Sequence, residues 1–153
     1  MANKICLETI DHIHSFVKNF FIDVYEKFSV IVFEKEIPDT IVFVCYEPEF
    51  IPDGYFLKEE KRLTAEYIKE YKNADGEEII YFQSTVFDKG RKMNTENAVT
   101  EEICGGLYVE NDNTRMFVKS DGKYEYYFEC DIKLTKEEFL RMAETVREKK
   151  ADG

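Results

Sequence analysis

Three acidic residues, Glu110, Asp112 and Asp121, are the first candidates for chemistry in this sequence, because carboxylates are usual ligands of calcium. The residues around them lack the glycine at the sixth loop position and the closing bidentate glutamate that an EF-hand requires. His12 and His14 are two positions apart, so on a helix they point to different sides and do not form the i, i+4 pair that binds zinc. The sequence therefore predicts no metal site.

Four cysteines, Cys6, Cys45, Cys104 and Cys130, are spread along the chain, and none forms the C-x-x-C pair of zinc and redox motifs. Cys130 shares strand parity with Phe128, which predicts a buried thiol that packs as a small apolar group. Free structural cysteines are therefore our expectation. A disulfide is the alternative for an exported domain, and the sequence leaves all three complete pairings of four cysteines open.

Catalytic motifs are missing from the sequence. It contains no glycine-rich phosphate loop, no nucleophile elbow, no H-E-x-x-H pair and no cysteine with a supporting histidine. Carboxylate pairs such as Glu101-Glu102 are plentiful, but abundance without fixed geometry does not indicate acid–base catalysis. We therefore predict no catalytic, cofactor-binding or metal-binding residues and no cofactor, and we rank an enzyme below a non-catalytic protein.

The formal net charge of −11 excludes some classes of partner. Nucleic acids and anionic membrane surfaces attract basic patches, so we expect no nucleic-acid binding. A single basic cluster, Lys89, Arg91 and Lys92, lies outside the C-terminus. A solvated loop is the favoured interpretation of this cluster, and a docking point for an acidic partner is the alternative.

The composition is rich in aromatic residues, with 13 Phe, 10 Tyr and no Trp. Aromatic side chains favour strands and fill cores, so an aromatic β core is expected. The alternative is an aromatic-lined pocket for an apolar ligand, although we predict no enclosed pocket of lipid size. The longest apolar runs, Val30 to Phe33 and Ile41 to Tyr46, are too short to span a membrane, and no cleavable signal is evident. With Met1 as the native start, the cytoplasm is the expected location.

Two amphipathic helices are predicted at the ends of the chain. Over about 8–28, apolar residues from Ile10 to Phe28 recur at three- and four-residue spacing, which is the pattern of a helix with one buried face. Over about 135–149, Thr135 and Glu138 form a capping box before an apolar stripe that begins at Phe139.

Between these helices, residues of about 40–132 have the pattern of an antiparallel sheet. Aromatic and β-branched runs alternate with short breaks, and the Asp75-Gly76 pair is typical of a hairpin turn with positive φ. Pro52, Asp53 and Gly54 predict a turn that launches the first of these strands. The predicted strands are Tyr55 to Leu63, Ala65 to Lys72, Glu78 to Phe87, Val99 to Cys104, Leu107 to Glu110, Arg115 to Lys119 and Lys123 to Ile132, with Ser29 to Glu34 and Thr40 to Tyr46 as further candidates.

Several of these turn, strand and cap residues carry a resemblance to a known family. They are Phe50-Ile51-Pro52-Asp53-Gly54-Tyr55, Gly76-Glu77-Glu78-Ile79-Ile80-Tyr81-Phe82-Gln83, Asn94-Thr95-Glu96-Asn97-Ala98 and Leu134-Thr135-Lys136-Glu137-Glu138-Phe139. Over roughly Phe16 to Glu148 the chain resembles the bacterial domain of unknown function 4367 family. The resemblance implies an extracytoplasmic module of Gram-positive bacteria, usually preceded by one membrane-spanning helix and suspected of regulatory or sensing roles. This sequence departs from the pattern because no spanning helix precedes the domain.

Together these observations predict a single α+β domain over 1–153. An antiparallel β meander of about six or seven strands is bracketed and covered by the N-terminal and C-terminal amphipathic helices. We expect a non-catalytic interaction or sensing module with a protein partner, extracytoplasmic if a membrane anchor precedes the chain. A carrier or sensor of an apolar, lipid-like ligand is the alternative function.

Overall fold

The computed structural model describes the backbone of residues 4–5, 13–17, 20–24, 28–33 and 91–94, and both backbone and side chains of residues 42–85, 95 and 97–150. Within these ranges it contains one helix, α1 (Lys136–Glu144), and fourteen strands in three sheets. No helix in the described ranges is long and apolar enough to cross a membrane.

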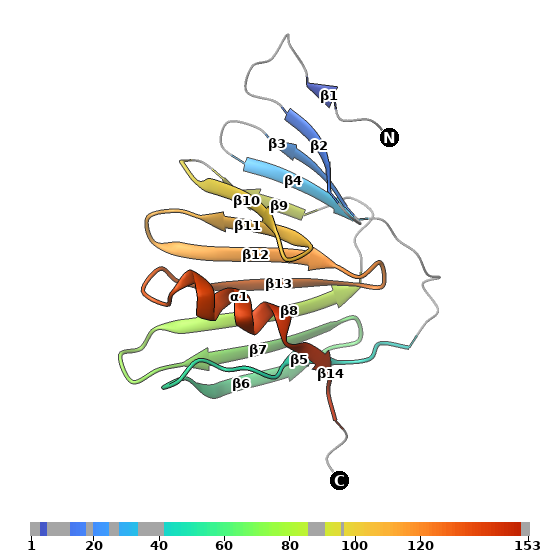
Figure 1. Cartoon of the computed structure of the whole chain (residues 1–153). Helices are drawn as coiled ribbons and strands as arrows, with labels where there is room; N and C mark the ends of the chain where they lie inside the picture. Colours follow the sequence, from blue (N-terminus) through green and yellow to red (C-terminus); the bar gives the residue numbers. More distant parts are fainter. Residues whose placement is uncertain are drawn as a thin grey trace.

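A seven-stranded antiparallel sheet forms the body of the molecule, in the order β10-β11-β12-β13-β8-β7-β6 (Figure 1). Its strands agree with those predicted from the sequence to within a few residues. They are β6 (Phe56–Arg62), β7 (Glu66–Lys72), β8 (Glu78–Thr85), β10 (Val99–Ile103), β11 (Gly106–Glu110), β12 (Thr114–Ser120) and β13 (Tyr124–Asp131). The sheet consists of two meanders, β6 to β8 and β10 to β13, joined where β13 pairs with β8.

Two predicted turns are present. Gly76 has φ +84° in the β7–β8 hairpin, and the Asn73 side chain accepts hydrogen bonds from the backbone N–H groups of Asp75 and Glu77. At the other turn the Tyr55 N–H donates to the Pro52 carbonyl at 3.2 Å. Pro52 is therefore the first residue of its turn, one place before the second position that proline usually occupies.

Strand β13 alternates in burial, and we call the face that carries its even-numbered residues the inner face. Tyr126, Phe128 and Cys130 of β13 are buried there. The opposite face of β13 carries Glu125, Tyr127, Glu129 and Asp131, a pattern that favours exposure to water, yet Glu125 is 0% exposed. Its cross-strand partner Ser84 is also 0% exposed, so the opposite face is covered at this position as well.

Helix α1 confirms the C-terminal prediction in its first part. The Thr135 side chain accepts a hydrogen bond from the Glu138 N–H at 3.2 Å, as the capping box requires. The predicted end at about 149 is wrong, because the helix stops at Glu144 and the next residues form β14 (Val146–Glu148). Strand β14 pairs antiparallel with β5 (Tyr46–Pro48), and this backbone pairing replaces the last helical turn.

The predicted N-terminal helix over about 8–28 is also wrong. The described parts of this region form strands β2 (Ile13–Val17) and β3 (Phe20–Val24). Together with β1 (Lys4–Ile5), β4 (Phe28–Phe33) and β9 (Arg91–Asn94) they make a second antiparallel sheet in the order β1-β2-β3-β4-β9. The apolar residues that fitted helical spacing are mostly β-branched or aromatic, and short apolar runs of this kind fit both periods.

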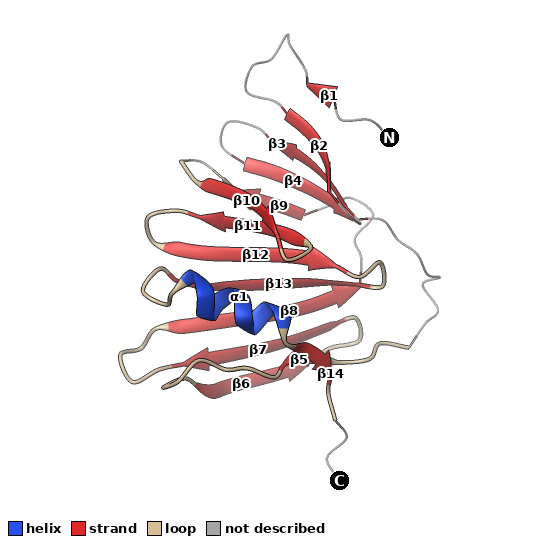
Figure 2. Ribbon diagram, viewed as in Figure 1, coloured by secondary structure: helices blue, strands red, loops and turns tan. Residues whose placement is uncertain are grey.

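Helix α1 and the β5–β14 pair lie on the same side of the seven-stranded sheet (Figures 1 and 2). They cover the inner face and close the hydrophobic core. Aromatic rings dominate that core: Phe128 packs against Tyr81, Phe117 and Phe139 with centroid distances of 5.0, 6.4 and 6.4 Å. The single helical layer over an antiparallel sheet is an α+β arrangement.

Candidate functional site

Residues 42–50, which we call the strap, run along the inner face in front of β7 (Figure 1) and are hydrogen-bonded to side chains of β8. One edge of the strap forms backbone hydrogen bonds with β14 and Lys149. The Tyr46, Glu47 and Pro48 positions of β5 pair with β14, and the Lys149 N–H donates to the Cys45 carbonyl at 2.8 Å. The strap is therefore an added strand on this edge.

Backbone groups on the other edge of the strap form hydrogen bonds with side chains of the seven-stranded sheet. The Gln83 amide donates to the Val44 carbonyl and accepts from the Tyr46 N–H, each at 2.8 Å. The Tyr81 hydroxyl donates to the Tyr46 carbonyl at 2.6 Å, and the Val44 N–H donates to the Tyr124 hydroxyl oxygen at 2.7 Å. These three side chains satisfy backbone groups that would otherwise need a neighbouring strand.

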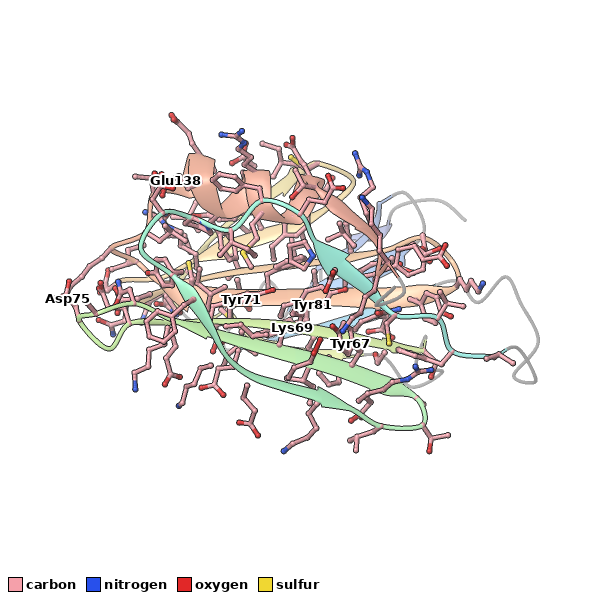
Figure 3. All side chains as sticks on the ribbon, turned by 90° about the horizontal axis from the view of Figure 1, so that it is seen from below. Tyr67, Lys69, Tyr71, Asp75, Tyr81 and Glu138 are labelled. Atoms are coloured by element: carbon pink, nitrogen blue, oxygen red, sulfur yellow. The ribbon has the colours of Figure 1, made fainter. Side chains whose placement is uncertain are left out.

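An ion pair holds the middle of the strap. The Lys69 ammonium lies 2.7 Å from a Glu47 carboxylate oxygen, and the exposed fractions of the two side chains are 11% and 27%. The ammonium also lies 5.7 Å from the centre of the Tyr71 ring. Figure 3 shows Tyr67, Lys69, Tyr71 and Tyr81 on the strap side of the sheet. The Tyr71 hydroxyl is buried and has no hydrogen-bond partner among the described residues.

A cleft of about 580 Å³ opens beside the first half of the strap. This volume lies within the usual range for ligand pockets. Three basic side chains and one acidic side chain contribute to it. The lining residues are Phe43, Val44 and Cys45 of the strap, Glu60 and Arg62 of β6, Tyr67 of β7, and Lys149 and Lys150 after β14. We call it the charged cleft.

Hydrogen bonds in the charged cleft fix its protonation states. Lys149 donates to Glu60 at 2.6 Å, and the Tyr67 hydroxyl donates to the same carboxylate oxygen. The hydrogen bond from Lys149 is the main reason that the pKa of Glu60 is lowered, and the same bond raises the pKa of Lys149. Burial and the Glu60 carboxylate raise the pKa of Tyr67. All three shifts move away from neutral pH, so these groups stay in their ordinary charge states and none is poised as a general acid or base.

The charged cleft still has donors to offer a ligand. Arg62 donates to the Phe43 carbonyl at 3.1 Å, which uses one of the five N–H donors of a guanidinium. Both Arg62 and Lys150 are exposed. With Glu60 neutralised by Lys149, the free charge of the cleft is positive, and its chemistry is that of binding a carboxylate or another anion.

A second cleft, of about 310 Å³, lies on the other side of Tyr46 and includes Cys104 and Lys119. Burial and a hydrogen bond to Glu144 raise the pKa of the Cys104 thiol to about 11, so the thiolate that a nucleophile needs is scarce at neutral pH. Burial lowers the pKa of Lys119, whose ammonium donates to the Ala143 carbonyl at 3.0 Å. This hydrogen bond ties Lys119 to the last turn of α1, so Lys119 has a structural role in this cleft.

Two of the three acidic residues singled out in the sequence, Glu110 and Asp121, have structural partners, and the third, Asp112, is exposed. Glu110 pairs with Arg115 and accepts from the Tyr108 hydroxyl at 2.5 Å, whereas Asp121 caps the β12–β13 hairpin through the Lys123 and Tyr124 N–H groups. No cluster of His, Cys, Asp and Glu suited to a metal ion occurs within the described ranges.

Some of the remaining sequence candidates lie within the described residues and some lie outside them. Cys45, Cys104 and Cys130 are free, as expected, and Cys130 is 2% exposed. Cys6 and the side chains of His12, His14, Lys89, Arg91 and Lys92 lie outside the described residues.

Sequence reasoning missed the residues that make this site. Arg62, Lys149 and Lys150 come from two segments far apart in the chain, so no local spacing connects them. Gln83 did carry a signal: it shares strand parity with Ile79 and Tyr81, and a polar residue in a buried row usually has a dedicated hydrogen-bond partner.

Comparison with known proteins adds a family and one solved structure. A family model with the description "Domain of unknown function (DUF4367)" matches residues 45–146, from the strap to the first residue of β14. A solved structure similar to the chain is described as "Crystal structure of MucB in complex with MucA(peri)". It has 12% sequence identity and a TM-score of 0.47, and the match covers 92% of this chain and 59% of that one. No curated protein matches the sequence.

Proposed function

We propose that this chain, which belongs to the family described as Domain of unknown function (DUF4367), is a non-catalytic module that binds a protein partner at the charged cleft. The charge of that cleft is the main support for binding there. The chain has a net charge of −11, yet this cleft gathers Arg62, Lys149 and Lys150 around one carboxylate, Glu60. A local reversal of sign in a concave site favours an acidic ligand.

An acidic peptide segment is the ligand that fits this chemistry best. Arg62 and Lys150 line the cleft from two different segments, β6 and the residues after β14, so an acidic segment in the cleft has two exposed cations to contact. The strap contributes Phe43 and Cys45 to the lining, and both belong to the core. The cleft therefore combines charged and apolar side chains, as protein-binding sites often do.

Binding rather than catalysis is supported by the protonation states in the cleft. The pKa of Glu60 is lowered and the pKa values of Lys149 and Tyr67 are raised, so no group there exchanges a proton readily near neutral pH. The regulatory or sensing role outside the cytoplasm that the family resemblance implies is part of this proposal. The alternative of an apolar-ligand carrier has less support, because the aromatic rings of the described core pack against one another.

Fluorescence anisotropy with a labelled hexaglutamate peptide tests the proposal. We expect the full chain to bind this peptide despite its own negative charge, and we expect hexalysine to be insensitive to changes in the cleft. The double variant Arg62→Ala/Lys150→Ala should weaken hexaglutamate binding by about tenfold or more, because it removes the two exposed cations.

The matched control is Lys61→Ala/Lys133→Ala, which removes the same charge from two side chains that are 55% and 75% exposed and lie outside the cleft. This control should change the affinity by less than about twofold. Equal losses in both double variants, or no binding of hexaglutamate to the unmodified chain, would contradict the proposal.

A further inference from the structure

The inner face binds the strap as a receptor binds a peptide, and this suggests that the strap is not its sole occupant. We propose that the strap occupies a docking groove on the inner face and is exchanged for an extended segment of the partner protein. The inference rests on the proposed function, because it names how that partner engages the domain after its acidic part has reached the charged cleft.

The sheet holds the strap through hydrogen bonds to the backbone of the strap. The three sheet side chains, Gln83, Tyr81 and Tyr124, bond the backbone of the strap at Val44 and Tyr46 and not its side chains. Backbone recognition of this kind binds a segment because it is extended, as in the addition of a strand to a sheet, and leaves the choice of sequence to the side-chain contacts. Since Gln83 is 0% exposed, its amide is also a costly group to leave unpaired, so an empty groove is unfavourable and a replacement segment is required.

The side-chain pattern of the strap defines the partner. Three alternate residues of the strap contact the inner face: Phe43 packs edge-on against Tyr124 with centroids 4.9 Å apart, Cys45 is 9% exposed in the core, and Glu47 pairs with Lys69. The Tyr46 ring adds contacts with the Tyr124 and Tyr126 rings, at centroid distances of 5.9 and 6.2 Å. The groove therefore fits an extended segment with an aromatic residue, a small apolar residue and a carboxylate at alternating positions.

The groove contains an unused group. The Tyr71 hydroxyl is buried next to Lys69 but has no hydrogen-bond partner among the described residues while the strap is bound. Buried hydroxyls are normally paired, so the strap leaves one binding contact of the groove unfilled. A partner segment that supplies an acceptor for Tyr71 would fit the groove better than the strap does.

The first half of the strap lies at the margin of the core. Phe43, Val44 and Cys45 line the charged cleft, so the first half of the strap borders an open cleft. Phe43 and Cys45 are 7% and 9% exposed, whereas Phe117, Phe128, Phe139 and Met142 in the rest of the core are 0% exposed. Segments at the margin of a core open locally at a lower free energy than the core itself.

The probe for exchange is a fluorescein-labelled peptide of residues 42–50 carrying Cys45→Ser, and binding to the full chain is followed by anisotropy. Glu47→Lys in the full chain places a cation against Lys69 and loosens the attached strap. We expect the peptide to bind this variant at least about tenfold more tightly than it binds the unmodified chain, because the attached strap competes less. A second peptide that also carries Glu47→Lys should bind at least about tenfold more weakly than the first.

Tyr71→Phe in the Glu47→Lys background is the matched control, because the strap makes no described hydrogen bond to that hydroxyl. It should leave the affinity for the first peptide unchanged. Equal binding of both peptides, or no binding of either peptide to either chain, would overturn the proposal.

Native-state hydrogen exchange on the unmodified chain keeps the inference testable if a variant fails to fold. We expect the Val44 and Tyr46 amides to exchange through local opening, at least about tenfold faster than the amides of β8 and β13. Exchange of all these amides at one common rate would mean that the strap leaves only when the domain unfolds, and the proposal would fail. Hexaglutamate binding at the charged cleft is read separately, so exchange can fail while the proposed function stands.

Discussion

The two halves of the inner face are held by different forces. Under α1 the contacts are apolar: Phe139 and Met142 of the helix are 0% exposed, and Phe139 packs against Phe128. Under the strap the contacts are directional, with hydrogen bonds from Gln83 and an ion pair from Lys69. We call these the helix-covered half and the strap-covered half.

The difference separates stability from recognition. Apolar packing gains free energy from the area removed from water and depends little on orientation, so the helix-covered half stabilises the fold. A hydrogen bond contributes little net free energy while it is made, but its loss leaves a buried group unpaired. The strap-covered half therefore selects what occupies it more than it adds to stability. Four substitutions test this comparison, from the largest expected effect to the smallest.

Phe139→Ala removes a ring from the centre of the helix-covered half. We expect the free energy of unfolding to fall by about 3–5 kcal/mol, which is the range for a fully buried phenylalanine. Urea titration followed by circular dichroism measures the change. Val99→Ala is the control, because Val99 is 66% exposed and its truncation should cost little. A loss for Phe139→Ala below about 1 kcal/mol would contradict the assignment of this half to stability.

Gln83→Leu keeps the size of the side chain in the strap-covered half but removes its two hydrogen bonds. The Val44 carbonyl and the Tyr46 N–H lose their partners, and we expect a loss of about 1–3 kcal/mol. The same urea titration measures it, with Tyr71→Phe as a control that removes no described hydrogen bond. A loss as large as that of Phe139→Ala would erase the distinction between the halves.

Gly76→Val lies outside both halves, at the tip of the β7–β8 hairpin, and calibrates the scale of a purely local change. Its φ of +84° disfavours a β-branched side chain, so we expect a loss of about 1 kcal/mol or more. Space is not the cause, because the nearest atom to an added Cβ is Lys72 Cε at 3.8 Å. An unchanged melting temperature would show that the hairpin tolerates the strained backbone.

Glu60→Gln tests the pH dependence of the strap-covered half. The pKa of Glu60 is lowered below its ordinary value of 4.5, so its carboxylate stabilises the folded state above that value. This contribution is lost as the pH falls through the lower, folded-state pKa. Between about pH 7 and about pH 3 the urea midpoint of the unmodified chain should therefore fall further than that of Glu60→Gln. The effect should be small, since the Glu60 side chain is 33% exposed. Parallel curves would exclude this linkage.

Sequence patterns predicted the seven-stranded sheet well because its strands are separated by strong turn signals. Asp75-Gly76 and the capping box at Thr135 act over a few residues, and both are present in the structure. The N-terminal region was mistaken for a helix because its apolar residues fit two periods at once, and strand propensity decided the outcome.

The candidate site was beyond sequence reasoning for a different reason. The strap meets Gln83 from 37 and 39 residues away, and Lys149 meets Glu60 from 89 residues away. Hydrogen bonds of this kind depend on the tertiary fold and leave no periodic pattern. The end of α1 shows the same limit, since pairing of β14 with β5 overrode the helical stripe after Thr145.

The β5–β14 pair also gives the domain a mechanical property. Tyr46, the first residue of β5, lies opposite Glu148, the last residue of β14. The chain therefore enters and leaves this strand pair at neighbouring points. A pulling force on these two points loads the hydrogen bonds of the pair one after another rather than all together. Such an unzipping geometry yields at low force. Under tension the strap would therefore detach first, while the strands of the seven-stranded sheet remain paired.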